Sequence, residues 1–200
     1  GAGEYSISIP VTLTMAKAYG SYSSALDFTP WDELVASGGV TVSDGKVTKI
    51  TKKDAILEVD PRITELASNL FTYATYTELV LPPSVTAAGK ACYSSKIEKI
   101  VFEEGYTEIP AHVCYYATKL KTAVVPDDVT AIATSAFENC TALSDFKFPS
   151  ALASLGSYSF KKCTNLGELP VYRNLPQSSS LGSASAFYQA GLKKITFVEG

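Results

Sequence analysis

The stretch that decides the fold is LVLPPSVTAA, residues 79–88, because a similar string, LEVDPRITEL, lies before it at 57–66. Related strings follow at 100–109, 123–132 and 146–155. Within these strings apolar residues alternate, as expected of a strand with one buried face. Proline or acidic residues then end the strand, as Pro82-Pro83 do in the quoted copy. The sequence is therefore an array of short strand-and-turn units.

Four apolar positions recur at an interval of about 22 residues, apart from one larger gap near residue 180. Each unit closes with a compact turn, such as residues 135–140, which is too short for a stable α-helix and is expected to form a helical or 3₁₀ turn. Since one unit cannot bury its apolar side alone, the units are expected to stack around a long shared core. The four columns are Val59, Leu81, Phe102, Val125, Phe148 and Val171; Ile63, Val85, Tyr106, Val129, Leu152 and Leu175; Leu66, Ala88, Ile109, Ile132 and Leu155; and Phe71, Tyr93, Cys114, Phe137, Phe160 and Phe187.

Composition excludes several classes of protein. Hydrophobic residues make up 46% of the 200-residue chain, too many for a disordered one. The net charge of −3 provides no basic field, so we expect no nucleic-acid partner. The single histidine excludes any site that needs two from this chain, and no apolar run approaches the ~20 residues of a membrane helix. The chain also lacks nucleophile-elbow, phosphate-loop and dinucleotide motifs, so we expect neither a cofactor nor enzymatic activity.

The units resemble the leucine-rich repeats of the BspA-like type, of about 23 residues each. The best match runs from Phe148-Pro149 through Phe160 and Cys163 to Leu166, and residues 125–143 match almost as well. The resemblance extends over residues 55–200. It implies an α/β fold: a right-handed leucine-rich repeat solenoid of about six repeats, strand-rich, with short helical or 3₁₀ turns.

Residues 1–54 do not fit the repeat. We expect short strands at 5–9 and 11–13, a short helix with Thr29 as its N-cap and Pro30 at its first position, and a hairpin over 40–50 closed by Asp44-Gly45. This order resembles the N-terminal cap of leucine-rich repeat proteins. The predicted organisation is a capping region at 1–54 and a solenoid at 55–200; a separate binding module at 1–54 is the alternative.

The C-terminal string at 195–200 repeats the string at 100–105, after which the earlier unit continues into its second half. We therefore expect the last repeat to be cut short. An exposed strand edge invites pairing, which predicts weak end-to-end self-association. An insertion of four residues near 177–180 is expected to lengthen the last unit.

Cys140 and Cys163 occupy one column of adjacent repeats, where they could form a disulfide, a metal pair or two buried thiols. Buried thiols are favoured, since the BspA-like pattern places cysteine in the core. Cys92 and Cys114 have no partner by spacing. Although Cys114 lies two residues from His112, the two side chains are expected to face opposite ways, so a nucleophile–base pair is not expected.

The outward face of the first strands is the predicted ligand-binding surface, since solenoids use such faces to bind partners. Tyr73, Tyr115 and Tyr116 on the turn side are a second candidate. The resemblance implies a secreted or cell-surface protein that adheres to or binds a protein ligand, from a host or on a neighbouring surface. The alternatives are a structural spacer and a carbohydrate-binding module of a larger surface protein. The predicted strand-face site is Glu78, Val80, Lys99, Val101, Val124 and Lys147.

Overall fold

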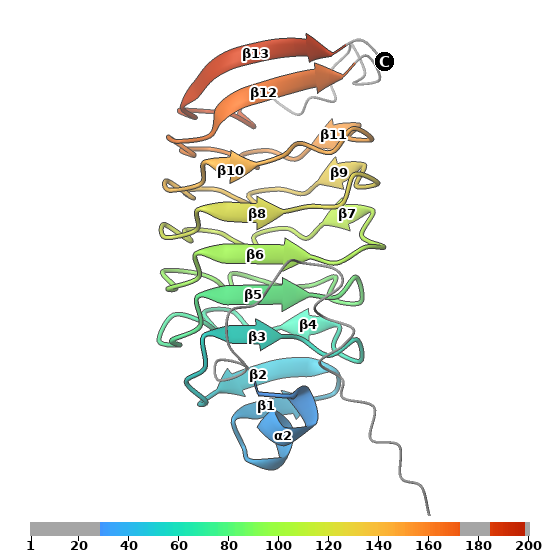
Figure 1. Ribbon diagram of the computed structural model, residues 1–200, viewed down its shortest axis with the longest axis vertical. Helices are drawn as coiled ribbons and strands as arrows, with labels where there is room; N and C mark the ends of the chain where they lie inside the picture. Colours follow the sequence, from blue (N-terminus) through green and yellow to red (C-terminus); the bar gives the residue numbers. More distant parts are fainter. Residues whose placement is uncertain (1–28, 173–184, 199–200) are drawn as a thin grey trace, which may run out of the picture.

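A computed structural model describes residues 29–172 and 185–198. The chain climbs as a right-handed solenoid from α2 to β13, one coil above another (Figure 1). The expected leucine-rich repeat solenoid is confirmed. The elements are α2 (Trp31–Ala36), β1 (Val40–Ser43), β2 (Lys46–Ile50), β3 (Ile56–Glu58), β4 (Glu65–Leu66), β5 (Glu78–Leu81), β6 (Lys99–Phe102), β7 (Glu108–Ile109), β8 (Thr122–Val124), β9 (Ala131–Ile132), β10 (Asp145–Phe146), β11 (Ser154–Leu155), β12 (Gly167–Tyr172) and β13 (Leu192–Val198).

Two parallel sheets run along the solenoid because each coil repeats the strand positions of the coil before it. The first has the order β10-β8-β6-β5-β3, and the second has the order β11-β9-β7. Register advances by one coil per strand: Leu57 pairs with Leu79, and Leu79 with Ile100. Strands β12 and β13 pair in the same parallel sense. The hydrogen bonds of both sheets therefore link one coil to the next.

The core lies between the sheets and the turns as a continuous column. The first three predicted columns are confirmed wherever the structure describes them, with each side chain at most 8% exposed. The fourth is wrong at one position: Tyr93 is 37% exposed, and Cys92 is buried in its place. Ile100 lies 21 residues after Leu79, whereas Ala123 lies 23 residues after Ile100. This coil is therefore two residues shorter than the next. A fixed spacing from Phe71 therefore selects the wrong residue.

The expected helical turns take the form of single hydrogen-bonded turns separated by left-handed residues. In the fourth turn, the N–H groups of Ala136, Glu138 and Cys140 donate within the coil, to the carbonyls three residues earlier. The alternate N–H groups of Ser135, Phe137 and Asn139 donate to carbonyls of the next coil. Ser135 and Asn139 have φ of 53° and 61°, in the left-handed region, which interrupts the 3₁₀ pattern. The turns thus form a third ladder between coils.

Before the solenoid lie a short helix and a hairpin. The hairpin is confirmed: β1 pairs antiparallel with β2, and Asp44 and Gly45 both have positive φ, as its turn requires. The helix begins one residue later than expected, at Trp31, with Pro30 rather than Thr29 at the N-cap and no side-chain cap. Strand β2 then pairs in parallel with β4. The predicted strands at 5–9 and 11–13, and the insertion near 177–180, fall outside the described residues.

Candidate functional site

The predicted strand face is less accessible than expected. Val80 and Val101 were expected to be exposed, but they are 1% and 0% exposed, whereas Val124 is 39% exposed. Val80 and Val101 each have an in-register neighbour on both sides, but β10 ends before reaching the level of Val124. The predicted apolar stripe is therefore reduced to Val124.

The charged residues of the strand face are joined by ion pairs between coils. Lys99 lies 2.9 Å from Glu78 on the neighbouring strand, and Lys147 lies 2.9 Å from Asp127. Lys121 and Glu98 form a similar pair at 2.8 Å. These contacts neutralise charge along the sheet, so this face presents little net field to a ligand.

The turns present a different surface, which we define by one recurring hydrogen bond. In each of six turns, an N–H donates to the carbonyl three residues earlier, as Tyr115 donates to His112. The donor, the acceptor and the residue after the donor make up the turn face: Asn69, Thr72 and Tyr73; Lys90, Tyr93 and Ser94; His112, Tyr115 and Tyr116; Ser135, Glu138 and Asn139; Tyr158, Lys161 and Lys162; Ser185, Tyr188 and Gln189.

Tyrosine dominates the turn face, which holds six of the chain's twelve tyrosines. Tyr93 stacks on Tyr115 of the next coil with ring centroids 6.2 Å apart, and Tyr116 packs beside both. Tyr73 is 97% exposed and Tyr188 is 52% exposed. Of these tyrosines, the sequence identified only Tyr73, Tyr115 and Tyr116 as candidates. The signal for Tyr93 and Tyr188 is their place directly after the inward-facing Cys92 and Phe187.

An ion pair with a buried carboxylate lies at the centre of the turn face. Glu138 Oε1 is 2.9 Å from Lys161 Nζ of the next coil, and Ser135 Oγ donates to Glu138 Oε2 at 2.7 Å. The Glu138 side chain is 8% exposed. Its hydrogen bond is the largest of the effects that raise the pKa of Lys161 above its ordinary value.

The lysines of the turn face also lie against aromatic rings. Lys90 Nζ is 4.3 Å from the centroid of Tyr115, and Lys161 Nζ is 4.4 Å from that of Tyr158. Beside Tyr158 and Lys161 the surface is hollowed, and Ser185 and Tyr188 also line this open pocket. The turn face thus combines exposed rings, hydroxyl groups and positive charge on a hydrogen-bonded backbone.

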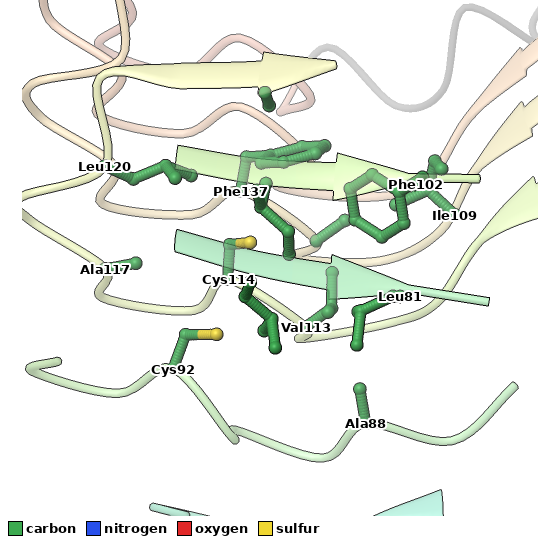
Figure 2. Close-up of a cluster of buried hydrophobic side chains, with 14 of the residues drawn as sticks. Leu81, Ala88, Cys92, Phe102, Ile109, Val113, Cys114, Ala117, Leu120 and Phe137 are labelled. Carbon is green, nitrogen blue, oxygen red and sulfur yellow. The ribbon is translucent and has the colours of Figure 1, made fainter. Parts of the chain in front are cut away.

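The cysteines are free thiols in the core, as expected for Cys140 and Cys163. Cys140 donates to the Cys114 carbonyl at 3.1 Å, and Cys163 to that of Phe137 at 3.0 Å. Cys92 and Cys114, for which spacing indicated no partner, lie one above the other and both point inward (Figure 2). Burial, with a hydrogen bond between these two thiols, raises the pKa of Cys114 well above its ordinary value.

The structure separates the other sequence candidates. Cys114 is buried, whereas His112 lies on the turn face with its ring 6.0 Å from that of Tyr115, so the two do not form a nucleophile–base pair. Within 29–172 and 185–198, no group of three or more His, Cys, Asp or Glu side chains could hold a metal ion. Over the same residues, no helix is long and apolar enough to cross a bilayer.

A strand-rich right-handed solenoid, with coils that repeat at a nearly constant interval along the sequence, defines a leucine-rich repeat protein. A family model of the BspA type leucine rich repeat region matches residues 52–144 and 90–200, with six copies of the repeat. The chain therefore belongs to the BspA-type leucine-rich repeat family. No curated protein matches it.

Among solved structures, the chain is similar to a leucine-rich repeat protein from Bacteroides ovatus, with a TM-score of 0.51 and 18% identity over 72% of this chain. The match covers 42% of that protein, so this chain spans less than half of its length. A leucine-rich repeat protein of T. pallidum matches with a TM-score of 0.42 and 14% identity, over 90% of this chain and 83% of that one. A leucine rich cell surface protein from Faecalibacterium prausnitzii matches with a TM-score of 0.33 and 20% identity, over 60% of this chain and 48% of that one. The structural similarity to the Bacteroides ovatus protein supports the assignment of a leucine-rich repeat solenoid.

Proposed function

We propose that the chain is a non-enzymatic binding protein of the cell surface or of the extracellular space, and that its solenoid binds a protein ligand. The turn face is the observation that carries the proposal. Tyrosine is enriched at protein interfaces because its ring provides rigid contact area and its hydroxyl provides a hydrogen bond. Here the tyrosines stand on turns that hydrogen bonds hold from coil to coil, so little ordering is required on binding. The family supports a binding role in general.

The strand face is the alternative site for the protein ligand. Val124 and Lys147 are exposed there, beside the ion pair of Glu78 and Lys99. A partner bound to this face would contact β-branched side chains and paired charges, whereas a partner bound to the turn face would contact tyrosine rings. Variants of the two faces separate the two sites: Tyr93→Ala with Tyr188→Ala on the turn face, and Val124→Lys with Lys147→Glu on the strand face.

The test is binding of the purified chain to a panel of extracellular-matrix proteins and to a glycan array. We expect saturable binding to a protein, weakened by the turn-face variants and unchanged by the strand-face variants. Binding to glycans with no protein bound would show a carbohydrate-binding module. The absence of binding to either set would contradict the proposal and favour a structural spacer.

A further inference from the structure

The turn face carries positive charge in a chain whose net charge is −3. Lys90, Lys161 and Lys162 lie on it, and Glu138 is its single carboxylate. Because Glu138 is buried and ion-paired with Lys161, its charge is matched within the protein. The face therefore presents an excess of positive charge, in contrast to the paired charges of the strand face.

The tyrosine rings hold two of these lysines in place. The ammonium groups of Lys90 and Lys161 lie over Tyr115 and Tyr158, at 4.3 and 4.4 Å from the ring centroids. Such a contact orients the cation without neutralising it. An ammonium has three donors, of which Lys161 directs one to Glu138, so donors remain for an acceptor from outside. Anchored cations lose less side-chain entropy when an anion binds.

The dimensions of the face limit the shape of its partner. Six coils stacked at the spacing of β-strands extend about 24 Å from the first turn to the last. To supply the ~800 Å² per partner of a stable protein interface, the strip would need a width of about 33 Å. The five residues of one turn span less than about 18 Å even when fully extended. The face therefore fits a single extended chain and is too narrow for the flat surface of a folded domain.

We propose that the turn face binds an extended acidic peptide segment of a partner protein, which lies along the solenoid axis. At about 3.3 Å per residue, seven or eight residues cover the six turns. The lysine ammonium groups pair with its carboxylates, the tyrosine hydroxyls donate to them, and Tyr158, Lys161, Ser185 and Tyr188 take one side chain into their pocket. This inference rests on the proposed function and names the chemistry of its ligand.

The test uses fluorescence anisotropy of labelled octaglutamate, an octapeptide of glutamate, with the full chain in about 50 mM salt, where screening is weak. We expect saturable binding, at least about tenfold tighter than that of octaglutamine. Lys90→Gln with Lys162→Gln, which spares the Glu138–Lys161 pair, should weaken it at least about fivefold. The matched control is Lys49→Gln with Lys52→Gln, two exposed lysines on or next to β2, which should leave binding within about twofold.

Three results overturn the inference. The first is no saturable binding of octaglutamate up to about 1 mM. The second is equal weakening by the control pair, which would indicate attraction to the chain's lysines in general. The third is tighter binding of a hyaluronan octasaccharide that competes for the same lysines, which would assign the face to an acidic glycan. If the matrix-protein panel still shows binding in any of these cases, the proposed function stands and its site lies elsewhere.

Discussion

Glu138 and Lys161, from successive coils, form an ion pair of 2.9 Å in which the glutamate side chain is 8% exposed. Its other oxygen accepts from Ser135 at 2.7 Å, so both carboxylate oxygens have partners within the protein. The pair ties the fourth turn to the fifth.

Replacement of Glu138 by alanine removes the acceptor of three side chains, those of Ser135, Asn139 and Lys161, of which Ser135 is 4% exposed. Because a buried polar group without a partner costs free energy, we expect the free energy of unfolding to fall by about 1–3 kcal/mol. Denaturant unfolding measures the change. The matched control is Glu98→Ala, which breaks an exposed pair with Lys121 and should cost less than about 1 kcal/mol. Equal losses in the two variants would contradict the role assigned to Glu138.

Phe137 is the central ring of the aromatic core. It stacks on Phe160 at 5.3 Å and meets Phe102 and Phe146 edge-on. Substitution by alanine leaves a cavity that two coils share, so we expect a loss of about 3–5 kcal/mol in the free energy of unfolding. Tyr73→Ala removes a ring that is 97% exposed and should stay within about 0.5 kcal/mol of the parent chain. A small loss for Phe137→Ala would mean that the coils close over the cavity.

Lys162 occupies a left-handed position, with φ of 59°. A β-branched residue is strained there, so Lys162→Val should lower the free energy of unfolding by about 1–2 kcal/mol, whereas Lys162→Asn should change it little. Lys119→Val places the same side chain at an exposed site outside the left-handed positions and should cost less than about 0.5 kcal/mol. Similar effects of valine at both sites would show that the turn tolerates other backbone conformations.

The four thiols should resist alkylation in the folded chain. Burial raises the pKa of Cys163 to about 12 and that of Cys140 well above its ordinary value, so little thiolate is available at pH 8. We expect iodoacetamide to label no cysteine of the native protein and all four after unfolding in guanidinium chloride, as counted by mass spectrometry. Fewer than four labels after unfolding without reductant would reveal a disulfide, contrary to the free thiols of the structure.

Glu58 and Glu103 set a dependence of stability on pH. Burial raises the pKa of both carboxyls, and their mutual repulsion raises that of Glu58 further. Each is therefore protonated more readily in the folded chain than in the unfolded chain. The free energy of unfolding then falls as the pH rises through about 4.3, the pKa of glutamate in the unfolded chain. The loss of stability is complete above the higher pKa of the folded chain.

Glu58→Gln should therefore stabilise the chain at pH 7, by less than about 1 kcal/mol because the site is half-exposed. It should have no effect at pH 3, where the parent carboxyl is also neutral. Urea unfolding at the two pH values measures both changes, and Glu104→Gln, at an exposed carboxyl next to Glu103 after β6, is the control. Stabilisation by Glu58→Gln that persists at pH 3 would contradict the electrostatic explanation.

The repeat made the solenoid predictable, because each column samples one environment several times and single irregularities average out. Leu57, Leu79 and Ile100 share a face for this reason. The same averaging misplaced Tyr93, since a fixed spacing takes no account of a coil that is two residues shorter than the next. The turn of this coil includes a left-handed residue, Ser94, with φ of 50°, and serine is not a residue type that indicates this conformation.

The candidate site was less predictable than the fold. Alternation along a strand indicates which side chains alternate between its two faces, but it does not indicate how exposed each face is, and Val101 is buried although it was expected to be exposed. The turn face depends on contacts across coils, such as that of Lys90 with Tyr115, which lie more than one repeat apart in the sequence. Once the turns of successive coils are aligned, the turn-face residues can be identified because they lie next to the inward-facing side chains.

The hydrogen bonds that link successive coils, in the sheets and in the turns, run along the solenoid axis, which determines how the molecule yields to force. A pull on the two ends along this axis loads the bonds of one coil at a time, so the structure peels and does not shear. Each coil released adds one repeat of slack, or about 75 Å of contour length. A stretched molecule would therefore extend in steps of nearly equal length. Each step unfolds one coil and absorbs work while the remaining coils stay folded.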